Sequence, residues 1–190
     1  MPTLTVVAGP NGSGKSTLTR LGRETFQDEP VLDPDAIARS LVATGEGGGS
    51  AIDAGRAVLQ KCEDSLATMQ SLLVETTLSG NTYLRMMGRA KARGYHVVLL
   101  FVGTDDVSIN LARVEQRVRD GGHDVAREDQ LRRYPRSMSN LEKAFTLADE
   151  AIVFDNSGAS HRLVAVKDAQ RTMLYEPVPV WGGFLRGEAR

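Results

Sequence analysis

The chain has 190 residues, of which 41% are hydrophobic and 25% charged, and its formal net charge is −1. This composition is typical of a globular protein with a substantial core, and it excludes a disordered chain and an overall basic field for nucleic acid. A single cysteine, Cys62, excludes an intrachain disulfide, and no apolar run of about 20 residues predicts a membrane span. We therefore expect a cytoplasmic protein with one domain over residues 1–190, divided into a core (1–158) and a C-terminal extension (159–190).

The N-terminal stretch predicts a strand, a glycine-rich loop and a helix over residues 16–27. The apolar run Leu4–Ala8 suits a buried strand, and GPNGSGKST after it matches the phosphate-binding pattern G-x-x-x-x-G-K-[ST]. Backbone N–H groups of such a loop surround phosphate, Lys15 adds a positive charge toward the β and γ phosphates, and the Ser16 hydroxyl binds Mg²⁺. The predicted nucleotide-binding residues are Gly9, Pro10, Asn11, Gly12, Ser13, Gly14, Lys15, Ser16 and Thr17.

Two carboxylates lie close to predicted strands. Asp35 follows the short strand predicted at Val31-Leu32 and precedes a helix over residues 36–42. Glu75 lies near the end of a third strand over residues 71–77. Asp35 has an alternative role as a helix N-cap, and Glu75 as an ion-pair partner at the sheet edge. Their positions after strands of an α/β pattern favour a second role in a ligand site.

The rest of the chain alternates helices with strands. Helical spacing covers residues 51–70 and 81–94, and the apolar run 96–102 predicts a central parallel strand. No Asp or Glu closes that run, so a conventional Walker-B acid is missing from it. A fifth strand and two short alternating segments are predicted at 151–154, 161–166 and 171–176. This order predicts an α/β P-loop kinase fold with a parallel five-stranded sheet flanked by helices, and a C-terminal β-hairpin.

Arginines gather on both sides of Gly121-Gly122. A helix over residues 105–120 places Arg113 and Arg117 four residues apart on one face, and Arg127 begins the helix that follows the glycines. Two helices joined at a glycine hinge can close arginines over phosphates, and a surface charge network is the alternative.

Six segments together resemble the zeta toxin family of P-loop kinases. They are GPNGSGKST (9–17), LDPDAIA (32–38), LLVETTLSG (72–80), RVEQRVRDGGHDV (113–125), RRYPRSMSNL (132–141) and VFDNSG (153–158). The family includes toxins that use ATP and Mg²⁺ to phosphorylate the 3′-hydroxyl of UDP-N-acetylglucosamine. The compact chain and its GGHDV segment resemble the short, free-standing bacterial members, for which kinase chemistry is a firmer expectation than the sugar-nucleotide substrate.

The resemblance implies catalytic roles for five residues. Lys15 matches the P-loop lysine, Asp35 the aspartate that acts as general base, and Glu75 the strand-end glutamate that helps to hold the substrate. Two arginines that stabilise the transferring phosphate match best Arg117 and Arg127.

The resemblance allows an alternative for one of the two arginines and adds one candidate nucleotide-binding residue. Arg113 competes with Arg117 for the first arginine position. The turn that lies near the adenine in the family falls at 155–158 and makes Asn156 a nucleotide-binding candidate.

The sequence thus predicts an ATP- and Mg²⁺-dependent kinase that phosphorylates a hydroxyl of a small molecule, with UDP-N-acetylglucosamine as the acceptor that the resemblance implies. The alternatives are a P-loop ATPase or switch protein without an acceptor, and a kinase of another metabolite or antibiotic. The pair Asp35 and Glu75 favours a kinase, because a switch protein has no clear need for both. A nucleic-acid partner is disfavoured by the net charge, and neither toxicity nor an antitoxin partner is carried over from the resemblance.

Overall fold

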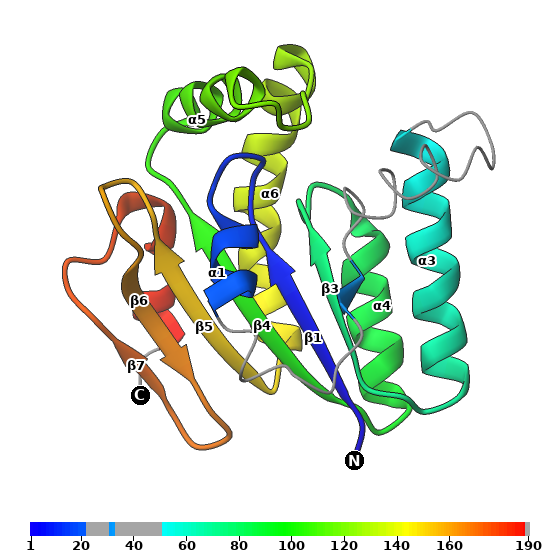
Figure 1. Ribbon diagram of the computed structural model, residues 1–190. Coiled ribbons are helices and arrows are strands. Elements are labelled where there is room, and N and C mark those ends of the chain that lie inside the picture. The colour runs from blue at the N-terminus through cyan, green and yellow to red at the C-terminus, as the bar shows by residue number, and fades with distance from the viewer. Residues whose placement is uncertain (22–30, 33–50, 189–190) are drawn as a thin grey trace.

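The computed structural model describes residues 1–21, 31–32 and 51–188 of the chain. Within these ranges, seven strands form one sheet in the order β2-β3-β1-β4-β5-β6-β7 (Figure 1). The strands are β1 (Thr3–Ala8), β2 (Val31–Leu32), β3 (Leu72–Thr76), β4 (His96–Gly103), β5 (Glu150–Asp155), β6 (Arg162–Lys167) and β7 (Thr172–Leu174).

The first five strands pair in parallel, as the alternation of helices and strands predicts. The predicted count of five strands for the sheet is nevertheless wrong. The predicted C-terminal hairpin is present as β6 and β7, and β6 pairs antiparallel with β5, so the hairpin extends the same sheet.

The helices lie on both faces of the sheet and above one edge of it. The described helices are α1 (Lys15–Leu21), α3 (Ala51–Ala67), α4 (Asn81–Ala92), α5 (Val107–Arg119), α6 (Arg127–Leu147), the 3₁₀ helix η1 (Val180–Gly182) and α7 (Leu185–Glu188). The helix predicted over 36–42, and Asp35 before it, lie outside the residues that the structure describes. Figure 1 shows α1 in front of the sheet, α4 and α6 behind it, and α5 above the carboxyl ends of the parallel strands.

Strand β1 is buried on both faces, which explains its continuous apolar sequence. Leu4, Val6 and Ala8 pack in the main core with side chains of α3, α4 and α6. Val7 points to the opposite face, where Leu18 of α1 packs against a second small cluster. This central position places the loop after β1 at the middle of the carboxyl edge of the sheet.

The C-terminal extension packs onto the core through two aromatic residues. The ring centroids of Trp181 and Phe101 are 6.2 Å apart, and those of Phe184 and Phe145 are 5.9 Å apart. A Cβ at Gly103 would lie 2.6 Å from the Trp181 ring, so the ring rests directly on the end of β4.

Cys62 is a core residue of α3. Its side chain is fully buried, and this burial, with a smaller contribution from the charge of Glu63, raises the pKa of the thiol to about 12. The thiol therefore stays protonated at neutral pH and is a packing group. None of the helices in the described ranges is both long enough and apolar enough to cross a membrane.

Candidate active site

The loop between β1 and α1 contains three glycines with positive φ, Gly9, Gly12 and Gly14. Gly9 has φ +143°, and a Cβ there would lie 2.2 Å from the carbonyl oxygen of Val102 in β4, so only glycine allows this close approach. Lys15 is the first residue of α1, and its Nζ donates to the carbonyls of Gly9 and Pro10, each at 2.9 Å. The lysine is therefore held at the loop, where the pattern places it.

Glu75 and Ser16 meet across two neighbouring strands. Glu75 in β3 pairs in register with Val7 of β1, and its carboxylate is almost fully buried. The Ser16 hydroxyl donates to Glu75 Oε2 at 3.0 Å. Strand β1 lies between β3 and β4. The end of β4 lacks a Walker-B acid, whereas β3 carries the carboxylate of Glu75.

The oxygens of Ser16 and Glu75 fit a magnesium ion. Mg²⁺ binds hydroxyl and carboxylate oxygens and usually keeps several waters, alongside phosphate oxygens. In the described part of the chain no group of three or more His, Cys, Asp or Glu residues could hold a metal ion. Ser16 and Glu75 could each supply one oxygen ligand to such an ion.

A cavity of about 780 Å³ lies at the carboxyl edge of the sheet, where α/β folds bind ligands. The end of β3, the α5–α6 pair and the β5–β6 turn contribute to its walls. Of the predicted nucleotide-binding residues, those that line it are Asn11, Gly12, Gly14, Lys15, Ser16, Thr17 and Asn156. Gly9, Pro10 and Ser13 are buried and do not line the cavity.

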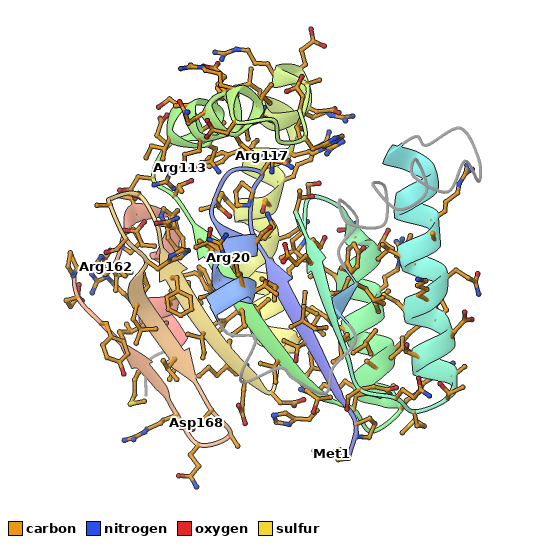
Figure 2. All side chains as sticks on the ribbon, in the orientation of Figure 1. Met1, Arg20, Arg113, Arg117, Arg162 and Asp168 are labelled. Atoms are coloured by element: carbon orange, nitrogen blue, oxygen red, sulfur yellow. The ribbon has the colours of Figure 1, made fainter. Side chains whose placement is uncertain are left out.

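Two arginines of α5 line the cavity in different ways. Arg113 donates from Nη1 to the carbonyl of Asn156 at 2.7 Å and from Nη2 to that of Gly158 at 3.0 Å. Arg117 donates from Nη2 to the carbonyl of His123 at 2.7 Å, and its buried Nε has no hydrogen-bond partner among the described residues. Figure 2 shows both side chains beneath α5. Arg113 thus holds the β5–β6 turn, whereas Arg117 binds the segment that follows α5.

The cavity is lined by Arg133 of α6, and not by Arg127, the residue chosen from the sequence. The side chain of Arg127 is 65% exposed, its nearest acidic partner is Glu115 at 3.9 Å, and it does not line the cavity. Arg133 lines the cavity and pairs with Asp129 at 3.0 Å. Arg127 and Arg133, two of the four arginines of α6, are separated by a rotation of about 240° around the helix axis, so they project from different sides. The geometry therefore favours Arg133 over Arg127 at the phosphates.

Asn156 acts on the loop itself. Its side chain is nearly buried, and Nδ2 donates to the carbonyl of Ser13 at 2.8 Å. A Cβ at Gly14 would lie 2.5 Å from this Nδ2, so the side chain packs tightly against the loop. Asn156 thus supports the backbone of the predicted phosphate-binding loop.

The side of the cavity away from the β5–β6 turn is lined by Thr76, Thr77 and Tyr83. Burial, with a smaller effect of Cys62, raises the pKa of the Tyr83 phenol. The phenol therefore stays protonated at neutral pH and can donate a hydrogen bond. Sequence reasoning missed Tyr83 because an isolated tyrosine in an amphipathic helix is typical of a core residue.

Comparison with known proteins identifies relatives by sequence. Residues 1–177 match the family model described as Zeta toxin. A Haemophilus influenzae protein described as uncharacterized is 37% identical over 126 residues, which cover 66% of this chain and 88% of that protein.

Two solved structures illustrate the similarity of fold. A chain of the AvrRxo1-ORF1:-ORF2 complex with ATP has a TM-score of 0.71 at 17% identity, over 92% of this chain and 60% of that one. The PezAT chromosomal toxin–antitoxin system of Streptococcus pneumoniae has a TM-score of 0.56 at 20% identity, over 85% of this chain and 72% of that one. At these identities the likeness concerns the fold, and this chain spans about 60% of the matched AvrRxo1 chain.

Proposed function

This chain belongs to the zeta toxin family, and on that premise we propose that it is a kinase that transfers the γ-phosphate of ATP to a hydroxyl of a small molecule. Family and fold support a phosphotransferase. The observation that carries the proposal is the single cavity that joins the P-loop, Glu75 and the arginines of two helices. The related AvrRxo1 complex with ATP supports ATP as the donor.

The donor half of the proposed site consists of the P-loop and its neighbours. The loop amides and Lys15 bind the β and γ phosphates, and Ser16 and Glu75 are the residues that would hold Mg²⁺. Mg²⁺ bound there would supply positive charge that offsets the negative charge developing on the transferred phosphate. Arg117 and Arg133 approach the γ-phosphate from α5 and α6 and stabilise the same charge.

The acceptor half lies on the side of Thr76, Thr77 and Tyr83. Their hydroxyl groups can hydrogen-bond an alcohol or sugar substrate. By its match to the family aspartate, Asp35 orients the acceptor hydroxyl and takes its proton as the phosphate is transferred. The family resemblance supports UDP-N-acetylglucosamine as the first acceptor to test.

The test is phosphoryl transfer from radiolabelled ATP in the presence of Mg²⁺. UDP-N-acetylglucosamine, other UDP-sugars, nucleosides and aminoglycosides are offered separately, and labelled products are resolved from labelled orthophosphate. We expect one acceptor class to become labelled and to accelerate ATP consumption. Hydrolysis to orthophosphate at one rate with every acceptor would instead identify an ATPase or switch protein.

The glycine pair between α5 and α6 allows a test of Arg117 without changing the arginine. A Cβ at Gly122 would lie 2.5 Å from Arg117 Cγ and 2.9 Å from the backbone oxygen of Arg117, so Gly122→Ala must displace this side chain and also shift the backbone at the end of α5. We expect kcat of phosphoryl transfer to fall by about tenfold, because the charge-stabilising group is moved rather than removed.

Gly121→Ala is the matched control for this prediction. Gly121 has φ +83°, and a Cβ there would meet no atom within 4 Å, so alanine strains only the backbone, at a cost of about 1 kcal/mol. Steady-state kinetics and thermal unfolding are measured for both variants. Equal kcat values for the two would show that displacement of Arg117 has no effect on transfer.

A further inference from the structure

A series of hydrogen bonds connects α6, the end of β4, α5 and the P-loop. The Tyr134 hydroxyl donates to the carbonyl of Thr104 at 2.6 Å, and the Thr104 hydroxyl donates to Asn110 Oδ1. Asn110 Nδ2 then donates to the carbonyl of Asn11 at 2.6 Å. Thr104 and Asn110 are 0% and 1% exposed. Because a buried polar group is costly to leave unpaired, this series fixes which end of the Asn110 amide faces the loop.

The tip of the P-loop also rests directly on α5. A Cβ at Gly12 would lie 2.5 Å from the backbone oxygen of Asn110 and 3.1 Å from Val114 Cγ2, and Gly12 has φ +72°. The loop and the helix are therefore in contact at their backbones. A shift of α5 must move the loop unless this contact opens.

The face of α5 that meets the loop also carries its arginines. Asn110, Arg113, Val114 and Arg117 recur at the spacing of one helix face. Arg113 binds two carbonyls of the β5–β6 turn, and Arg117 lines the cavity. Asn110 is thus the point at which the arginine-bearing face is joined to the phosphate-binding loop.

We propose that Asn110 is a positioning residue that holds the P-loop in its phosphate-binding conformation and keeps it in register with the arginines of α5. This inference rests on the proposed function only in requiring that ATP binds at the P-loop. The side chain acts through the carbonyl of Asn11, which it orients so that the loop amides stay directed at the phosphates.

The first test removes the N–H donor of Asn110 and keeps the shape of its side chain. Asn110→Asp retains an acceptor for Thr104 but has no N–H for the carbonyl of Asn11. We expect the Kd for ATP, measured by calorimetry, to rise by about tenfold, the change that follows from loss of one buried hydrogen bond. The KM for the acceptor should stay at its wild-type value, because the acceptor side of the cavity is not attached to Asn110.

Asn140→Asp is the matched control. Asn140 is also buried, and its Nδ2 donates to the carbonyl of Leu78 at 2.9 Å, but it does not line the cavity. The same substitution there should lower the midpoint of thermal unfolding and leave the Kd for ATP unchanged. Equal losses of ATP affinity in the two variants would reduce the role of Asn110 to general stability and overturn the inference.

Thr104 provides an independent pair of variants if Asn110→Asp fails to fold. Thr104→Val removes the hydroxyl that orients the Asn110 amide and should weaken ATP binding, whereas Thr104→Ser keeps the hydroxyl and should restore it. Wild-type affinity in both Asn110→Asp and Thr104→Val, or in Thr104→Val alone where the first variant is unfolded, overturns the inference. Absence of ATP binding in the wild-type protein would instead overturn the proposed function.

Discussion

Replacing Arg117 by alanine is expected to lower kcat of phosphoryl transfer by about 10³, the effect of losing an arginine that stabilises the transferring phosphate. The guanidinium is held in place by the carbonyl of His123, and its buried Nε has no partner in the described part of the protein. An arginine fixed beside a phosphate site in this way needs little reorganisation when charge develops. The Kd for ATP should change much less than kcat.

Alanine variants of Arg133 and Arg127 test the same role of arginine in α6. The two residues lie on one helix, but the side chain of Arg127 is more exposed than that of Arg133. Arg133→Ala should lower kcat by about 10² or more, while Asp129 keeps its second ion pair, with Arg132. Arg127→Ala should leave kcat within about twofold, since a 65% exposed arginine whose nearest acid is 3.9 Å away contributes little.

Steady-state kinetics with the acceptor identified by the labelling screen measure all three variants. The order of effects is the informative result, since all three variants lose the same kind of side chain. A large loss of kcat in Arg127→Ala together with a small one in Arg133→Ala would support the sequence-based choice of Arg127. It would also mean that α6 rotates or moves when substrates bind.

The difference between Arg127 and Arg133 illustrates a limit of sequence reasoning. The pattern after Gly121-Gly122 correctly predicts a second helix, which ends at Leu147 in the structure. Which side of that helix faces the cavity depends on how α6 packs against β4 and α4, and these contacts are distant in the sequence. The one local signal is Asp129, which lies four residues before Arg133 and pairs with it.

The strands and the P-loop were predictable because their signals are local. A continuous apolar run marks β1, and the glycines after it mark a loop that must approach other backbone closely. The pairing of Ser16 with Glu75 was not predictable, because it depends on β3 lying beside β1 in the sheet. Asn110 gave no signal either, since an asparagine in a polar helix usually faces solvent.

Replacing Glu75 by glutamine is expected to lower kcat/KM by about 10² at a fixed, moderate Mg²⁺ concentration. Glutamine retains an oxygen that can accept the hydrogen bond from Ser16, so the variant removes mainly the negative charge. A carboxylate that positions Mg²⁺ and its waters contributes through this charge. Raising the Mg²⁺ concentration should therefore recover part of the lost rate.

Binding of ATP without metal distinguishes this role from a purely structural one. Next to the phosphates, the carboxylate of Glu75 repels the nucleotide unless a cation lies between them. In Glu75→Gln, metal-free ATP should therefore bind at least as tightly as in the wild-type protein, while the Mg²⁺-dependent gain in affinity shrinks. A general disturbance of the site would weaken both forms of binding together.

Ser16→Ala is the companion variant, because it removes the other oxygen of the proposed magnesium site and leaves the carboxylate. It should raise the Mg²⁺ concentration needed for half-maximal rate, as Glu75→Gln does. The double variant should then reduce kcat/KM by a factor smaller than the product of the two single reductions, since both residues act on one ion. Independent, multiplicative effects would separate Glu75 from the metal and place it with the acceptor, where the family resemblance puts the corresponding glutamate.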